Sequence, residues 1–222
     1  EGRTVYDNLR KALLFLLPTN GAQALVIVVA ILLGVALPIT PVQILWVNMV
    51  TAVTLALALA FEPAEFNVMQ RPPRNPGEPL LSGIMLWRIS AVSALLVIAP
   101  LGLFLWEVAN GRPTAEARTL AVNALVMGEI FYLFNSRYIH NSVLSRAGLL
   151  GSRPVLISIG LMLLLQLAFT YFPPLQHLMG TEPISMADWG IVTLAGVVVL
   201  LLVELEKAVW RRLRRSETGH GA

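Results

Sequence analysis

Six apolar segments, each about as long as a bilayer is thick, dominate this sequence of 222 residues. A membrane-spanning helix needs about 20 apolar residues, because each residue rises about 1.5 Å along the helix axis. In lipid, a helix also satisfies its backbone hydrogen bonds internally. The predicted spans run from Leu13 to Leu33, Val42 to Phe61, Ile84 to Trp106, Ala117 to Phe134, Val155 to Phe172 and Ala187 to Leu205. We therefore expect an all-α membrane protein built as a bundle of six transmembrane helices.

The overall composition supports a lipid environment. Hydrophobic residues make up 56% of the chain, charged residues only 13%, and the mean hydropathy is +0.72. A soluble domain of this size has too little interior to bury that much apolar surface. The segments between the spans are rich in Pro, Gly, Asn and charge, and none is long enough for another soluble domain. We expect residues 1–222 to form a single domain whose main surroundings are the lipid bilayer.

The distribution of positive charge predicts the orientation. Lys and Arg concentrate before the first span, between the second and third, between the fourth and fifth, and after the sixth. Short loops with Lys and Arg stay in the cytoplasm, so both termini are predicted to be cytoplasmic. This asymmetry and contact with anionic lipid account for the net charge of +3, and we expect no nucleic-acid partner.

Two other sequence features limit the function. The chain has no cysteine, which excludes disulfides and thiolate metal sites. It begins with Glu, without a secretory signal, and it contains no nucleotide-binding or phosphorylation motif. We expect further sequence upstream and no cofactor bound by this chain itself.

Polar residues in the first two spans suggest a path for a cation. Asn20 and Gln23 are one helical turn apart, which places them on the same face, and Pro18 precedes them. Proline lacks an N–H group, so we expect it to free the carbonyl of Leu14 close to these amides. The second span repeats the spacing with Asn48 and Thr51, followed by Thr54.

Two interpretations of these residues remain open. Amide, hydroxyl and carbonyl oxygens are ligands that hard cations prefer. The same side chains are also common in hydrogen bonds between membrane helices.

Glu129 is the only carboxylate well inside a predicted span. An ionisable group at this depth indicates a functional site, where it would bind a cation, carry a proton or donate a hydrogen bond in its neutral form. Glu204 and Glu206 lie beside Lys207 at the end of the last span, and we interpret them as a surface ion pair. Arg88 is interpreted as an interfacial anchor.

Several sequence motifs resemble those of calcium-pump-like P-type ATPases over essentially the whole chain. The matching segments are EGRTVYDNLRK at 1–11, PVQILWVNMVT at 41–51, FEP at 61–63, MQRPPR at 69–74, EPLLS at 78–82, and Glu129 followed by Asn135, Ser136 and Arg137. The resemblance implies that the six spans are helices five to ten of a ten-helix pump, and that this chain is its C-terminal transmembrane transport domain.

The resemblance also implies the roles of particular residues. Asn20, Gln23, Asn48, Thr51 and Glu129 would bind the transported cation, with Asn20, Asn48, Thr51 and Glu129 as the metal ligands. A loop containing Arg71, Pro72, Pro73 and Arg74 would couple the membrane helices to the phosphorylation domain. ATP and Mg²⁺ would be used by the missing N-terminal portion of the pump, and this chain alone would contain no catalytic residue.

Two substitutions set this chain apart from the family's calcium sites. Gln23 stands where calcium pumps have glutamate, and Ala52 stands where pumps of this group usually have aspartate. A divalent ion that leaves water needs counter-charge, so we do not expect a two-calcium site. A monovalent ion, a proton-coupled cycle or a single divalent ion remain as alternatives.

Other functional classes also remain open at this stage. They are a six-helix secondary transporter and a non-catalytic membrane module, although no internal repeat supports the transporter. The short loops favour a bacterial plasma membrane.

Overall fold

The structure is a computed structural model that describes residues 2–62, 80–139 and 141–219. Within these ranges the regular elements are all helical, and six helical segments are long and apolar enough to cross a membrane. Five of the six are the continuous helices α1 (Gly2–Leu32), α4 (Gly83–Ala109), α5 (Thr114–Arg137), α7 (Arg153–Tyr171) and α9 (Met186–Gly219). The other is composite and joins α2 (Pro41–Thr51), the π-helical segment η1 (Ala52–Ala56) and α3 (Leu57–Ala60). The prediction of six spans is confirmed.

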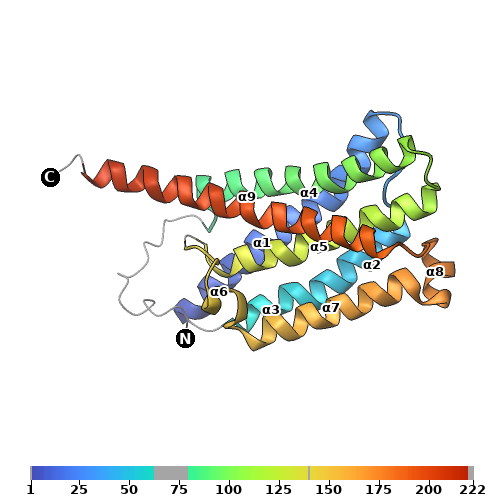
Figure 1. Ribbon diagram of the computed structural model, residues 1–222. Coiled ribbons are helices and arrows are strands. Elements are labelled where there is room, and N and C mark those ends of the chain that lie inside the picture. Colours follow the sequence, from blue (N-terminus) through green and yellow to red (C-terminus); the bar gives the residue numbers. More distant parts are fainter. Residues whose placement is uncertain (1, 63–79, 140, 220–222) are drawn as a thin grey trace.

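Two helices extend well beyond their predicted spans. The helix α1 begins at Gly2 rather than Leu13, and α9 continues past Leu205 to Gly219. The start of α1 and the end of α9 lie at the same end of the bundle (Figure 1). We call this the inner end and the opposite one the outer end. The cytoplasmic location of the inner end stays a prediction from the charge distribution.

The connections between spans use ordinary helix-terminating chemistry. The hydroxyl of Ser82 accepts a hydrogen bond from the backbone N–H of Met85 at the start of α4. The short helix α6 (Arg146–Leu150) is capped in the same way by Ser145. The short helix α8 (Pro173–Met179) ends at Gly180, whose φ of +64° lies in the left-handed region that glycine adopts without strain.

The helix α5 forms the centre of the bundle. Within the most apolar window of each span, 83% of the α5 residues are buried, against 28% in α7 and 33% in α9. Glycines allow its neighbours to approach closely: a Cβ added at Gly128 would lie 2.6 Å from Leu96 of α4, and one added at Gly196 of α9 would lie 2.4 Å from Phe131. Most residues of α5 are therefore shielded from lipid by the neighbouring helices, and Glu129 is among them.

Candidate functional site

Glu129 lies at the point where three helical spans meet. Its side chain is completely buried in α5. Gln23 of α1 donates a hydrogen bond from Nε2 to Glu129 Oε1 at 2.9 Å, and Thr51 of α2 donates one from Oγ1 to Glu129 Oε2 at 2.8 Å. The structure therefore brings together three of the five residues predicted to bind the cation.

Both groups that contact the carboxyl group of Glu129 are neutral. Among the described residues, no lysine or arginine forms an ion pair with it. A buried carboxylate is costly unless a positive charge compensates it. The site can therefore take up a proton or a cation, and Gln23 and Thr51 provide further oxygen atoms beside the carboxyl group.

Thr51 occupies a special place in the backbone. It is the last residue of α2, and the π-helical segment η1 begins at the next residue. In this region the hydroxyl of Thr54 donates to the carbonyl oxygen of Val50 at 2.7 Å. Short π-helical segments interrupt the regular hydrogen-bond ladder and are frequent at functional sites. Nothing in the mostly apolar sequence of residues 52–56 distinguishes η1 from a regular α-helix, so the sequence did not predict it.

Asn20 and Asn48 are placed differently from their partners at the same spacing. Both are exposed, whereas Gln23 and Thr51 are buried. Residues three apart differ by about 60° around a helix, and here the edge of the buried face passes between them. The structure thus brings Gln23, Thr51 and Glu129 into contact and places Asn20 and Asn48 beside that contact on exposed faces.

The backbone near Pro18 also differs from the expectation. The helix α1 continues through Pro18, and the carbonyl oxygen of Leu14 accepts a hydrogen bond of 2.7 Å from the hydroxyl of Tyr132. The carbonyl oxygen of Pro18 accepts one of 3.3 Å from Ser93. The prediction of a free Leu14 oxygen beside the amides was wrong, because a tyrosine distant in the sequence satisfies it.

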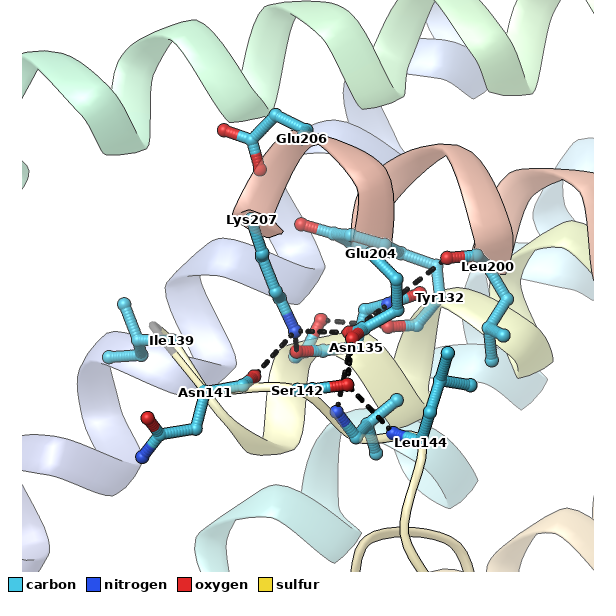
Figure 2. Close-up of polar contacts among 12 residues, drawn as sticks. Tyr132, Asn135, Ile139, Asn141, Ser142, Leu144, Leu200, Glu204, Glu206 and Lys207 are labelled. Carbon is cyan, nitrogen blue, oxygen red and sulfur yellow. Dashed lines mark hydrogen bonds and ion pairs between the residues drawn. The ribbon is translucent and has the colours of Figure 1, made fainter. Parts of the chain in front are cut away.

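A dense polar cluster lies at the inner ends of α5 and α9 (Figure 2). Lys207 and Glu204 form a buried ion pair of 2.9 Å, and Lys207 also donates to the carbonyl oxygen of Asn135 at 2.8 Å. Glu204 accepts further hydrogen bonds from the side chains of Asn135 and Ser142. The interpretation of Glu204 as part of a surface ion pair was wrong, because the segment around Ser142 covers it.

Two buried arginines at the inner end also form ion pairs. Arg88 of α4 pairs with Glu206 of α9 at 2.9 Å and donates to the carbonyl oxygen of Ile139. Arg88 is 5% exposed, so it is a buried tie between helices rather than an interfacial anchor. Arg137, the last residue of α5, pairs with Glu62 at 2.8 Å. The predicted coupling residues Arg71, Pro72, Pro73 and Arg74 lie outside the described residues.

The outer end has a charged cluster of its own. Arg112 lies 2.8 Å from Glu107 and 2.9 Å from Asp188, with Glu116 at 3.7 Å. Although burial acts in the opposite direction, the hydrogen bond to Asp188 and the three negative charges raise the pKa of Arg112 above its ordinary value. Arg112 therefore stays charged and ties the outer ends of α4, α5 and α9 together.

The sequence is similar to known proteins over most of its length. Residues 36–209 match the protein family described as "Cation transporting ATPase, C-terminus". The chain is 44% identical over 203 residues to the probable cation-transporting ATPase F of Mycobacterium tuberculosis, and the aligned region covers 91% of this chain and 22% of that protein. It is 37% identical over 198 residues to the calcium-transporting ATPase of Bacillus subtilis, and the aligned region covers 86% of this chain and 22% of that protein. The chain thus spans about a fifth of the length of these relatives.

Proposed function

Because the chain belongs to the C-terminal membrane region of the cation-transporting P-type ATPases, we propose that it supplies part of the cation-binding site of an ATP-driven pump. Gln23, Thr51 and Glu129 form the part of the site held by this chain. ATP and Mg²⁺ are used by the remainder of the pump, which this chain does not contain. The bacterial origin of these two relatives supports a location in a bacterial plasma membrane.

The observation that carries this proposal is the contact between Glu129, Gln23 and Thr51. It joins three helical spans through residues 106 and 78 positions apart in the sequence. Its single carboxyl group is buried without a positive partner among the described residues. A transported cation provides the missing positive charge.

The exposed Asn20 and Asn48 support a site shared with another segment of the pump. An amide that faces hydrocarbon loses its hydrogen bonds to water without replacing them. Asn20 is one turn from Gln23, and Asn48 is one turn from Thr51, so both lie close to the Glu129 site on the side that this chain leaves uncovered. We infer that a membrane helix from the N-terminal portion of the pump covers this side and completes the cation ligands.

The charge of the site favours a cation with a modest demand for counter-charge. The described part of the site contains Glu129 as its one carboxylate, and Gln23 and Thr51 are neutral. A second calcium ion would need charge that these residues do not supply. We propose transport of a monovalent cation or a single divalent cation, with proton exchange at Glu129 as the alternative use of the carboxyl group.

A reconstituted full-length pump tests the proposal. ATP hydrolysis would be measured in proteoliposomes with Na⁺, K⁺, Mn²⁺ or Ca²⁺ over a range of concentrations. We expect one of these cations to stimulate hydrolysis and the variant Glu129→Gln to raise the concentration for half-maximal stimulation at least about tenfold, as expected for a lost charged ligand. Glu182→Gln, at an exposed position on the outer side, is the matched control.

Three outcomes would contradict parts of the proposal. Unchanged stimulation in Glu129→Gln would remove Glu129 from the site. Stimulation by micromolar Ca²⁺ with two cooperative sites would contradict the argument from reduced charge. Normal cation affinity in both Asn20→Ala and Asn48→Ala would show that these amides only pack against a neighbouring helix.

A further inference from the structure

The inner ends of the helices that form the Glu129 site are joined by a second polar contact. Glu62 directly follows the last turn of α3. Its carboxylate Oε1 accepts a hydrogen bond of 2.8 Å from Nε of Arg137, and Nη2 of Arg137 lies 2.8 Å from the same oxygen in the ion pair. The backbone carbonyl oxygen of Glu62 accepts a hydrogen bond of 2.8 Å from the side chain of Asn8 in α1. Arg137 also donates to the carbonyl oxygen of Gly148. Asn8, Glu62 and Arg137 are all buried, and we call these three residues the inner clamp.

The inner clamp and the site lie on the same three helical spans. Asn8 shares α1 with Gln23, and Arg137 shares α5 with Glu129. Glu62 is separated from Thr51 only by η1, α3 and Phe61. The α2–η1–α3 span is therefore attached to α5 at two points, at Thr51–Glu129 in the membrane and at Glu62–Arg137 near the inner end.

The two attachments differ in the stiffness of the backbone between them. On α5, Glu129 and Arg137 are joined by uninterrupted α-helix, which fixes their separation. On the other span, the backbone between Thr51 and Glu62 passes through η1, where the hydrogen-bond ladder is irregular. A change of one residue in helical register turns a side chain by about 100°, so a released η1 can turn Thr51 away from Glu129.

We propose that Arg137 and Glu62 are positioning residues that hold Thr51 against Glu129 by fixing the inner end of the π-helical segment. The inference rests on the proposed function, because the readout that matters is cation binding at Glu129. The described ion pairs Lys207–Glu204, Arg88–Glu206 and Arg112–Asp188 join α4, α5 and α9 or lie within α9, and none includes α1, α2 or α3. Arg137–Glu62, in contrast, links two of the spans that form the site.

Lys207 offers a control for the general cost of removing a buried charge. Lys207 and Arg137 are both almost completely buried, and both pair with a glutamate. The described polar contacts of Lys207 are to Glu204 of α9, to Asn135 of α5 and to Asn141 in the segment that follows α5. In the full-length pump, Arg137→Met should raise the half-maximal concentration of the stimulating cation about tenfold, the loss expected for one hydrogen bond to a charged group. Lys207→Met should lower thermal stability similarly and leave the half-maximal concentration within about twofold of wild type.

A double-mutant cycle identifies the route of the effect. If Arg137 acts by positioning Thr51, then Arg137→Met should cost little further affinity in a Thr51→Val background. Arg137→Lys should recover only part of the affinity, because lysine keeps the positive charge beside Glu62 but not the planar guanidinium that contacts both Glu62 and Gly148. Hydrogen–deuterium exchange should become faster at residues 52–56 in Arg137→Met and not in Lys207→Met.

The outcomes separate the inference from the proposed function. Equal affinity losses in Arg137→Met and Lys207→Met, or additive losses with Thr51→Val, would overturn the positioning role while the pump proposal stands. A wild-type pump stimulated by no cation would overturn the proposed function itself. If Arg137→Met does not fold, then Arg137→Lys and Glu62→Gln carry the same comparison, and unchanged cation affinity with unchanged exchange at 52–56 in both would overturn the inference.

Discussion

Glu129 and Glu204 are both buried glutamates, yet their surroundings differ in one decisive respect. Glu204 has a positive partner, Lys207, together with hydrogen bonds from Asn135 and Ser142. Among the described residues, Glu129 has only the neutral donors of Gln23 and Thr51. A carboxylate paired with a lysine or arginine side chain holds helices together. A buried carboxylate without such a partner can accept a cation or a proton from solution.

The position of each glutamate along the bundle fits this difference. The ion pairs of Glu204, Glu206 and Glu62 lie at the inner end, and the pair of Asp188 with Arg112 lies at the outer end. Between these tied ends, Glu129 occupies the middle of α5. The charged pairs hold the ends of the helices and leave the central carboxyl group uncompensated.

The largest expected effect comes from breaking the Lys207–Glu204 pair. Lys207→Met should lower the free energy of unfolding by about 3–5 kcal/mol, because it leaves the carboxylate of Glu204 buried without a positive partner. The double variant Lys207→Met with Glu204→Leu should recover a large part of that loss. Thermal unfolding in detergent measures both, with Arg153→Met at an exposed position as the control. A loss no larger in Lys207→Met than in Arg153→Met would contradict the structural role of this pair.

An intermediate effect is expected at Tyr132. Its hydroxyl is the hydrogen-bond donor to the Leu14 carbonyl, which cannot bond to Pro18 in the helix. Tyr132→Phe should therefore cost about 1–3 kcal/mol of stability, because it leaves a buried carbonyl unsatisfied. The same unfolding measurement applies to Tyr171→Phe, which loses the hydrogen bond that the hydroxyl donates to Ile184 and the one that it accepts from Trp189. Because Tyr171 is much more exposed than Tyr132, this variant should cost less. Equal losses would show that the Leu14 carbonyl finds another partner.

The smallest effect on stability is expected at Glu129 itself. Glu129→Gln leaves no buried positive charge without a partner, so the free energy of unfolding without cation should change by less than about 1 kcal/mol. The stabilities of the wild-type pump and Glu129→Gln should differ when the transported cation is added. A saturating cation at about 100 times its dissociation constant should stabilise the wild-type pump by about 2.7 kcal/mol and the variant by much less. A large loss of stability in the absence of cation would place Glu129 with Glu204 as a structural carboxylate.

Much of the helical architecture was predictable because hydropathy is a local property. The six spans follow from runs of apolar residues whose transfer from water to lipid is favourable whatever their neighbours are. The importance of Glu129 was predictable for the same reason, since a carboxyl group in such a run is unusual by itself.

The predictions that differ from the structure concern the hydrogen-bond and ion-pair partners of polar groups. Spacing placed Asn20 with Gln23 and Asn48 with Thr51, but it does not give the rotation of a helix against its neighbours, so it could not show which member of each pair is buried. The Leu14 carbonyl was expected to be free because its partner, Tyr132, is 118 positions away. Glu204 was interpreted as part of a surface ion pair and Arg88 as an interfacial anchor, because spacing does not show that the segment around Ile139 and Ser142 contacts both side chains.

The sequence by itself determined that this chain crosses a membrane as helices, where these helices begin and end to within about four turns, and that Glu129 is an unusual group in a lipid-spanning segment. Only the tertiary structure decided that Gln23 and Thr51 turn toward Glu129, that η1 interrupts the second span after Thr51, and that Arg137 meets Glu62. The physical reason is that insertion in lipid depends on each segment separately. A hydrogen bond or ion pair depends on the distance and rotation of two helices, which are set by packing across the whole bundle.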